Sequence, residues 1–179
     1  MFNLGIRAGV TDRRPYLAML DENNVRQGFF EYPEFQAILK HFPGYLRPVM
    51  IMAYITGWRI RSEILTRQKR HLDLQSSWLR LEPGEEKNKA GRQFPLTPQL
   101  RQVLEEQVAL TREMEVATGR IIPWLFHRNG ERIKDFRGAW EKACELAGLS
   151  KRYPHDFRRT AVRNLERAGV PRSVAMKMV

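Results

Sequence analysis

The residues best suited to chemistry in this sequence lie in a short run that begins at His155. His155 and Arg158 stand three residues apart at the start of a helix predicted over 154–168. Residues three apart on an α-helix lie on the same face, so both side chains are expected to point to one place. A planar guanidinium beside a titratable imidazole suits an anion such as a phosphate group. The run therefore predicts half of a phosphate-binding site.

Two segments far upstream carry further charged side chains. The first reads Thr56-Gly57-Trp58-Arg59-Ile60-Arg61-Ser62-Glu63, and the second reads Lys87-Asn88-Lys89-Ala90-Gly91-Arg92, followed by Phe94-Pro95-Leu96. The glycines and the proline indicate turns of the chain that can present charged side chains. Each segment alone is commonplace, so the interpretation depends on their order along the chain and on what brings them together.

Apolar periodicity predicts the elements that must position these residues. Helices are predicted over 31–42, 45–55, 98–110, 136–147, 154–168 and from 171 to the end. Strands are predicted over 77–81 and 92–96, joined by a hairpin that holds both lysines, with a further edge strand over 121–126. The helix over 45–55 is apolar almost all round, so it should be the central helix, with Gly57 as its stop.

Composition narrows the class of partner. The net charge of +11 and a pI near 10.3 predict an anionic partner such as nucleic acid. No apolar run approaches the roughly 20 residues that span a bilayer, so no membrane partner is expected. Cys144 is the single cysteine, which fits a reducing, cytoplasmic compartment. The four histidines are scattered, so neither a metal nor any other cofactor is predicted.

Together the three charged segments resemble the tyrosine recombinases, the phage integrase family. In that family the first arginine follows a Thr-Gly-x tripeptide, a lysine precedes a basic strand ending in Pro-Leu, and a His-x-x-Arg box comes late. All three features occur here in that order, and the resemblance covers residues 30–179. It implies an α+β, mainly α-helical fold, in which a small antiparallel sheet of about three strands packs on a helical core.

The resemblance assigns catalytic roles to four residues. Arg59 and Arg158 would form a paired clamp on the two non-bridging oxygens of a five-coordinate phosphorus. Lys87 would protonate the leaving 5′ oxygen, and His155 would hydrogen-bond the phosphate or take the proton of the attacking hydroxyl. Two choices stay open at this stage, Arg59 against Arg61 and Lys87 against Lys89.

Further residues are expected to support these four or to contact DNA. Glu63 is expected next to the catalytic residues, where it would orient an arginine or stabilise the first turn of the following helix. The residues expected to contact DNA are Arg61, Lys89, Arg92, Arg159 and Arg163.

The family's nucleophile, a tyrosine late in the chain, has no counterpart among the residues after His155. The tyrosines all precede it: Tyr16, Tyr32, Tyr45, Tyr54 and Tyr153. We therefore expect residues 29–179 to be a catalytic domain that is incomplete at its C-terminal end. Residues 1–28 are expected to be a linker with the end of a missing core-binding domain. Such a chain should bind DNA weakly and form no covalent adduct by itself.

The resemblance implies a site-specific DNA recombinase or integrase that cuts and rejoins double-stranded DNA through a 3′-phosphotyrosyl intermediate. It also implies self-association of the full-length protein, as a tetramer on DNA, in a bacterial or phage setting. Three alternatives stay open. One is a catalytically silent DNA-binding remnant or regulator, the second is a type IB topoisomerase, and the third is a tyrosine supplied by a neighbouring protomer.

Overall fold

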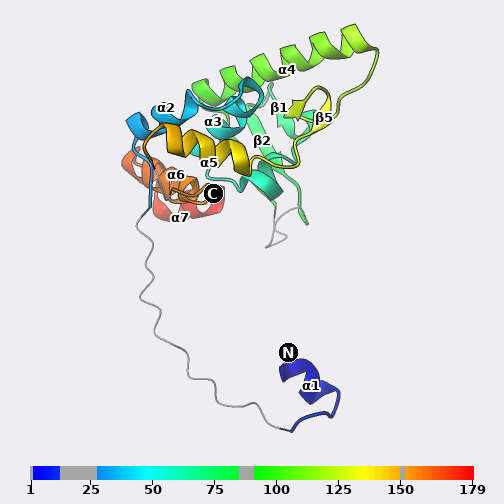
Figure 1. Ribbon diagram of the computed structural model, residues 1–179, viewed down its shortest axis with the longest axis vertical. Helices are drawn as coiled ribbons and strands as arrows, with labels where there is room; N and C mark the ends of the chain where they lie inside the picture. Colours follow the sequence, from blue (N-terminus) through cyan, green and yellow to red (C-terminus); the bar gives the residue numbers. More distant parts are fainter. Residues whose placement is uncertain (1, 13–27, 85–90, 150–151) are drawn as a thin grey trace.

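The computed structural model describes residues 2–12, 28–84, 91–149 and 152–179 (Figure 1). The helices of the described part are α1 (Phe2–Arg7), α2 (Tyr32–Leu39), α3 (Arg47–Thr56), α4 (Pro98–Thr118), α5 (Arg137–Leu146), α6 (Asp156–Arg167) and α7 (Arg172–Met178). The strands are β1 (Leu72–Asp73), β2 (Trp78–Leu81), β3 (Arg92–Pro95), β4 (His127–Arg128) and β5 (Glu131–Arg132). Short helical turns lie at Gly44–Leu46, Ile60–Ile64 and Lys69–His71.

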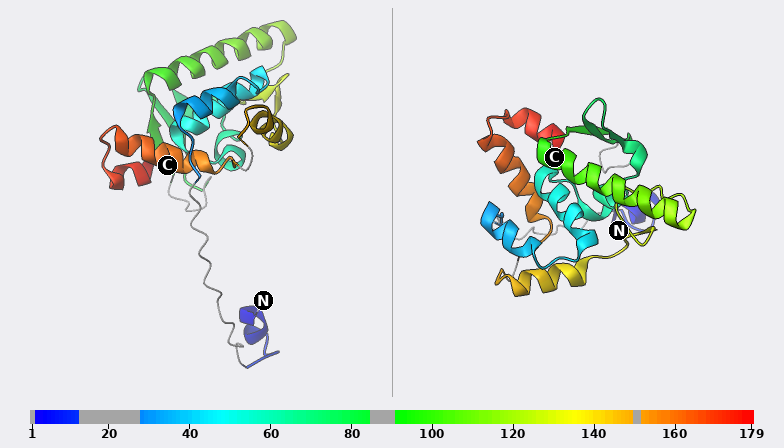
Figure 2. Two further views of the ribbon diagram at one scale, coloured as in Figure 1. Left: turned by 60° about the vertical axis from the view of Figure 1, so that its left-hand side comes forward. Right: turned by 90° about the horizontal axis from the view of Figure 1, so that it is seen from above.

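Helix α3 lies at the centre of the fold, as its apolar composition predicted. Its buried positions include Val49, Met50, Met52 and Ala53, each 0% exposed. Helices α2, α4 and α6 all pack against it, and Figure 2 shows α4 and α6 on its two sides. A helix that is apolar all round can be stable in water only when neighbours cover it in this way. Because α6 begins with Asp156, this packing also fixes where His155 and Arg158 lie.

The small sheet has the strand order β1-β2-β3, and both strand pairs are antiparallel. Leu79 pairs with Phe94, and both side chains are buried, at 0% and 1% exposure. The burial along β2 alternates, as expected for strands with one face on a core. The predicted sheet of about three antiparallel strands is confirmed, with β1 as its third member.

The ends of helices α3 and α4 carry capping residues, among them the stop predicted at Gly57. The hydroxyl of Thr97, at the start of α4, accepts a hydrogen bond from the backbone N–H of Leu100 at 3.3 Å. Helices α3 and α4 end at Gly57 and Gly119, which have φ values of 68° and 65°. This left-handed conformation is accessible to glycine without steric cost, so both glycines are effective helix stops.

The prediction of an edge strand over 121–126 is wrong. Within that stretch only Trp124 makes a β-bridge, with Gln68, and Ile121 is 89% exposed. Pro123 has no N–H to donate, so a ladder cannot continue through it. The local hairpin forms further on, between β4 and β5, around the predicted turn at 129–130.

The chain leading into α2 is held against α6. The backbone N–H of Phe30 donates to the Thr160 hydroxyl at 2.9 Å, and the Phe30 ring is 1% exposed. The Arg163 guanidinium lies 3.7 Å from the centre of the Phe29 ring and 3.0 Å from a Glu31 carboxylate oxygen. Residues 29–31 therefore pack against α6. Upstream of them, the helices of the described part are limited to α1, since residues 13–27 lie outside it.

Within the described residues, no helix combines the length and the apolar composition needed to cross a bilayer.

Candidate functional site

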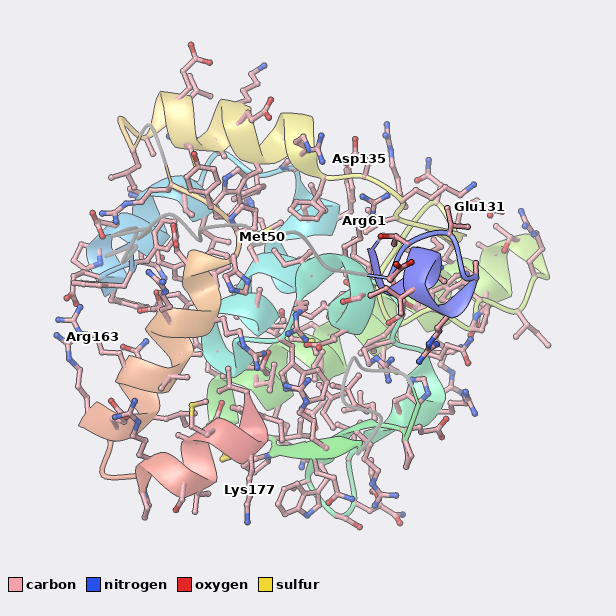
Figure 3. All side chains as sticks on the ribbon, turned by 90° about the horizontal axis from the view of Figure 1, so that it is seen from below. Met50, Arg61, Glu131, Asp135, Arg163 and Lys177 are labelled. Carbon is pink, nitrogen blue, oxygen red and sulfur yellow. The ribbon has the colours of Figure 1, made fainter. Side chains whose placement is uncertain are left out.

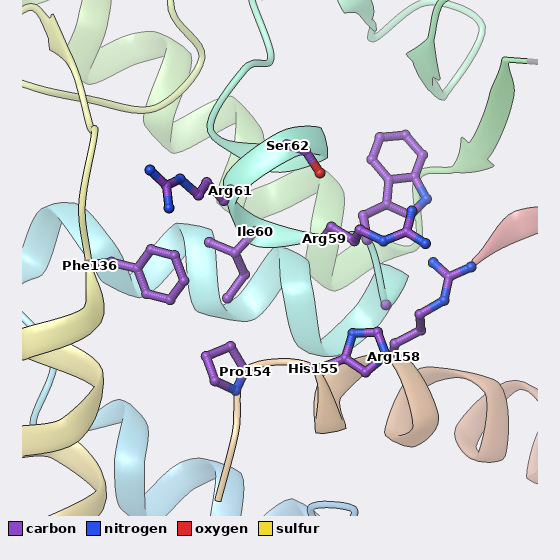
Figure 4. Close-up of a pocket in the computed structure, with 10 residues that line it drawn as sticks. Arg59, Ile60, Arg61, Ser62, Phe136, Pro154, His155 and Arg158 are labelled. Carbon is purple, nitrogen blue, oxygen red and sulfur yellow. The ribbon is translucent and has the colours of Figure 1, made fainter. Parts of the chain in front are cut away.

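One cavity of about 250 Å³ is lined by Arg59 and, from a segment almost 100 residues later in the sequence, by His155 and Arg158. The cavity lies between the turn Ile60–Ile64 and the start of α6 (Figure 4). In this view the side chains of Arg59 and Arg158 point into the same space, with the His155 ring beside them. The two predicted halves of the phosphate site therefore meet in the folded protein.

The backbone before Arg59 is held by two side chains, and the chain changes direction at Gly57. The Thr56 hydroxyl donates to the carbonyl of Met52 at 2.8 Å and accepts from the N–H of Trp58 at 3.2 Å. The Trp58 indole is 1% exposed, and its N–H donates to the carbonyl of Met178 at 2.8 Å. The Thr-Gly-Trp sequence thus ends α3, reverses the chain and delivers Arg59 to the cavity.

Gly57 also allows α6 to approach α3 closely. A Cβ atom at this position would lie 2.7 Å from Val179 Cγ1 and 2.8 Å from the Cβ of Ala161. Gly57→Ala is therefore expected to destabilise the fold by about 3 kcal/mol, through strain in the left-handed backbone and through overpacking. The measurement is the free energy of unfolding in urea.

Gly119→Ala is the matched control for Gly57→Ala. Gly119 has nearly the same φ, but nothing lies within 4 Å of the position that its Cβ would take. It should lose only about 1–2 kcal/mol, from backbone strain alone. Equal losses in the two variants would mean that the contact between α3 and α6 at Gly57 contributes nothing.

Glu63 holds Arg59 from both the backbone and the side chain. One carboxylate oxygen accepts the backbone N–H of Arg59 at 2.8 Å, and the other accepts its guanidinium at 2.6 Å. The turn between them is a π-helical turn, in which the N–H of Leu65 reaches back to the carbonyl of Ile60 at 2.8 Å. Such turns are rare and often occur at functional sites. Both contacts expected of Glu63, with an arginine and with the start of the following turn, are present.

Arg92 lies in a different place from the one expected. Its guanidinium donates to the same Glu63 oxygen as Arg59 does, at 2.9 Å, and its side chain is 8% exposed. Glu63 itself is 1% exposed, so one buried carboxylate joins β3 to the Arg59 turn. We therefore do not propose that Arg92 contacts DNA.

A buried arginine that the sequence did not single out supports the same turn. Arg67 is 1% exposed; its Nε donates to the Glu63 carbonyl at 2.8 Å and its Nη1 to the Arg80 carbonyl at 3.1 Å. The side chain thus ties the turn to strand β2. No pattern in the sequence indicated this role, because arginine side chains are mostly exposed in folded proteins.

Arg158 and His155 are presented by the first turn of α6. The Arg158 backbone N–H donates to the His155 carbonyl at 3.1 Å, and the Arg158 guanidinium donates to the Val179 carbonyl at 2.8 Å. Partial burial, Arg158 and Arg59 lower the pKa of His155 below its ordinary value of 6.5. His155 is therefore neutral at pH 7, and each of its ring nitrogens can serve as donor or acceptor according to tautomer.

The pKa of His155 gives a direct measure of the convergence of charge in this cavity. In an NMR titration, the His155 pKa is expected below 6.5 in the wild type and higher in Arg158→Ala, because one repelling cation is gone. Inorganic phosphate should raise it too, since a bound anion favours the imidazolium. Because the folded-state pKa is depressed, protonation favours the unfolded chain, and stability should fall as the pH drops below 6.5. A His155 pKa that does not change in Arg158→Ala would contradict the placement of these two side chains.

Arg61 also lines the first cavity, but its guanidinium does not lie with those of Arg59 and Arg158. In Figure 4 it lies on the opposite side of the turn from Arg59, toward Phe136. The pKa of the Asp135 carboxyl is lowered chiefly by the hydrogen bond from the Arg137 backbone N–H, and the charge of Arg61 adds to this effect. Of the two arginines left open by the sequence, Arg59 is the one beside Arg158.

Lys87 and Lys89 lie outside the described residues. Gly91, which directly follows that stretch, lines a second cavity of about 900 Å³ together with Arg59 and Arg158. The segment that carries both lysines therefore rejoins the described chain beside the two arginines. The choice between Lys87 and Lys89 stays a prediction.

The last two residues expected to contact DNA differ from each other. Arg159 is exposed on α6, one residue after Arg158. Arg163 instead binds Phe29 and Glu31, as described above, and lies on the outer side of α6 in Figure 3. We therefore propose that Arg159 contacts DNA, and we do not propose this for Arg163.

Two other kinds of chemistry find no support at this site. Among the described residues, no group of three or more His, Cys, Asp or Glu side chains could hold a metal ion. Cys144 is buried in α5, and burial raises the pKa of its thiol to about 11. A thiol with that pKa supplies almost no thiolate at neutral pH, so it is not a nucleophile here.

Comparison with known proteins gives a consistent result. The model of the phage integrase family matches residues 29–179. Similar solved structures include the Tn1549 transposon integrase in complex with transposon right end DNA, with a TM-score of 0.74, 16% identity and 99% of this chain covered. A lambda integrase dimer bound to a COC′ core site has a TM-score of 0.73 and 17% identity over 99% of this chain. XerA recombinase has a TM-score of 0.68 and 17% identity over 84% of this chain.

These matches concern part of each relative. The chain spans 66% of the length of the Tn1549 and lambda integrase structures and 55% of the length of XerA. No curated protein matches the sequence. At such identities the structural likeness establishes the fold, and the family model covers most of the chain, 151 of its residues if both ends of 29–179 are counted.

Proposed function

Because this chain belongs to the phage integrase family, we propose that it forms the phosphate-binding part of a site-specific DNA recombinase. Such an enzyme cuts and rejoins double-stranded DNA through a 3′-phosphotyrosyl intermediate. One observation carries the proposal: two arginines and a histidine from distant segments converge on one cavity. Like charges repel one another, so a bound anion such as a phosphate would stabilise this convergence.

The arginines would act on the phosphate undergoing exchange. Arg59 and Arg158 each present a planar fork that can donate to two oxygens and that stays charged at any physiological pH. As the phosphorus becomes five-coordinate, charge grows on its two non-bridging oxygens, and the fixed guanidinium groups stabilise it. The contact of Arg59 with buried Glu63 keeps this fork in place before the substrate arrives.

Proton transfer would complete the reaction. The hydroxyl of a tyrosine attacks the phosphorus, the bond from phosphorus to the 5′ oxygen breaks, and a 3′-phosphotyrosyl bond forms. His155, neutral at pH 7, can accept the tyrosine proton or hydrogen-bond the phosphate. Lys87 would give a proton to the leaving 5′ oxygen, with Lys89 as the alternative. The tyrosines of the given sequence all precede His155, and none of them is proposed as the nucleophile.

Binding of duplex DNA tests the proposal with the chain as it is. About four phosphate contacts would give a slope near −3.6 in log affinity against log salt, which means about a 10²-fold loss when the salt rises fourfold. Arg59→Ala and Arg158→Ala should each reduce the slope by about one. Arg112→Ala removes an equal charge from the exposed face of α4 and should leave the slope unchanged. An affinity that does not depend on salt would contradict the proposal.

A catalytically silent DNA-binding module is the second candidate. It predicts the same salt dependence but no cutting when a nucleophile is supplied. Tetramer assembly on DNA and the division of the chain at residue 28 remain predictions within the first proposal.

A further inference from the structure

A third cavity, of about 490 Å³, adjoins the phosphate site on the far side of the turn that carries Arg59. Arg61, Phe136 and Pro154 line both this cavity and the first one, so the two are neighbours. The remaining wall comes from the loop before α5, from α5 and from the chain entering α6, including Lys134, Arg137, Trp140 and Tyr153. We refer to it as the Arg61 cavity.

The turn itself aims two arginines at two different places. Residues two apart on a helical turn do not face each other, so Arg59 and Arg61 point in opposite directions. Figure 4 shows this arrangement, with Arg59 on the side of Arg158 and Arg61 on the side of Phe136. One short segment therefore contributes a cation to each cavity.

The Arg61 cavity carries an excess of positive charge. Within the described part of the chain, Arg61, Lys134 and Arg137 have no side-chain hydrogen bond or ion pair. The carboxylate of Asp135 accepts the backbone N–H groups of Phe136 and Arg137 at 2.9 and 3.1 Å, at the start of α5. These three cations share the cavity with two acids, Asp135 and Glu141, and the remaining positive charge favours an anionic ligand.

The same cavity has an aromatic wall. Tyr153 is 46% exposed, and Phe136 is half-buried beside it. The Trp140 ring is held behind them, because its N–H donates to the Arg152 carbonyl at 3.1 Å. A flat ring and a neighbouring anion together describe a nucleotide, and aromatic faces beside cations are the usual platform for an unstacked base.

The two cavities differ in volume, and the difference suits them to different ligands. At about 250 Å³ the first cavity fits a phosphate group, whereas about 490 Å³ lies in the range of pockets that bury a small organic ligand. A base inside a duplex is stacked on both faces and cannot enter such a pocket, but an unpaired base can.

We propose that the Arg61 cavity receives one unpaired nucleotide of the DNA strand next to the phosphate held by Arg59 and Arg158. Tyr153 and Phe136 stack on its base, and Arg61 and Arg137 contact its phosphate. This inference rests on the proposed function, because the strand must already lie at the first cavity.

The test uses this chain and a duplex with one unpaired 2-aminopurine nucleotide beside a nick, compared with the fully paired duplex. Stacking on an aromatic ring quenches 2-aminopurine, so binding of the wild type should lower the fluorescence of the unpaired probe. The affinity for the nicked DNA should be about tenfold higher than for the paired duplex. Tyr153→Leu and Arg61→Ala should each lose most of that preference, and Tyr153→Leu should lose the quenching.

Two matched variants serve as controls. Tyr32→Leu removes another exposed tyrosine, at 53% exposure on α2, and Arg112→Ala removes an equal charge from α4. Both should keep the quenching and the preference for the unpaired nucleotide. Free 2-aminopurine deoxynucleotide at the same concentration should show no quenching; equal quenching would overturn the assignment to a nucleotide within a strand.

The outcomes separate this inference from the proposed function. Salt-dependent binding of the paired duplex with no quenching of the unpaired probe would overturn the inference and leave the proposed function intact. Failure to bind the paired duplex at all would instead contradict the proposed function. Equal effects of Tyr153→Leu and Tyr32→Leu would also overturn the inference.

Discussion

Arg158→Ala is expected to lower the rate of strand cutting by about 10²- to 10³-fold, which is the usual effect of removing one donor from a preorganised anion site. Arg158 shares the cavity with Arg59 and His155, so its loss removes half of the clamp. Arg158→Lys keeps the charge but loses the planar fork, and it should recover only part of the rate. Arg59→Ala should show a defect of similar size, since the two side chains face the same space.

The measurement is the single-turnover cutting of a nicked duplex with the nucleophile supplied. It can be supplied as hydrogen peroxide, a small nucleophile able to enter the cavity, or as a tyrosine in a longer polypeptide that contains this domain. Arg112→Ala on α4 is the control of equal charge and should cut at the wild-type rate. If Arg158→Ala cut as fast as this control, the clamp would have no role in the reaction.

Glu63→Ala should produce the largest loss of stability, about 3–5 kcal/mol, because it breaks a buried ionic cluster by removing its only acid among the described contacts. The carboxylate is 1% exposed and accepts hydrogen bonds from both Arg59 and Arg92. The Arg92 side chain is 8% exposed, so its guanidinium would lose this carboxylate while water can reach it only slightly. The same change should also slow cutting, since Arg59 loses the contacts that hold its position.

Urea unfolding measures the change, with Glu113→Ala on the exposed face of α4 as the matched control. The control should stay within about 0.5 kcal/mol of the wild type. The double variant Glu63→Ala with Arg92→Leu should regain part of the lost stability, because it also removes the buried charge of Arg92. A single variant Glu63→Ala as stable as Glu113→Ala would mean that the cluster does not support the fold.

The helices could be predicted from the sequence because each depends on local signals. The apolar positions of α3, the hydroxyl of Thr97 at the start of α4 and the stop at Gly57 act within one or two turns of the chain. The hairpin strands were equally local, since β2 and β3 alternate buried and exposed residues on either side of one turn. The prediction of a strand over 121–126 was wrong because it depended on a distant contact. The apolar residues of this stretch indicated a strand, but its pairing depends on the position of Gln68.

The residues of the site could be named in advance, but not all of their contacts. The convergence of Arg59 with Arg158 was expected from the family resemblance, and Glu63 was expected to orient an arginine or to stabilise the first turn of the following helix. The burial of Arg92 and of Arg67 against the Glu63 turn, and of Arg163 against Phe29, had no sequence signal. The sequence alone does not distinguish an arginine that contacts DNA from one that binds a carboxylate or packs against an aromatic ring.

The sequence by itself determined the family, the types of the reacting side chains and the local elements that present them, because those depend on composition, periodicity and order. Only the tertiary structure decided that the guanidinium groups of Arg59 and Arg61 lie on opposite sides of one turn, and that Glu63 joins Arg92 to this turn. These outcomes depend on the packing of α6 on α3 and of β3 on the turn. Such contacts join residues far apart in the chain, and their geometry is set only when the core has formed.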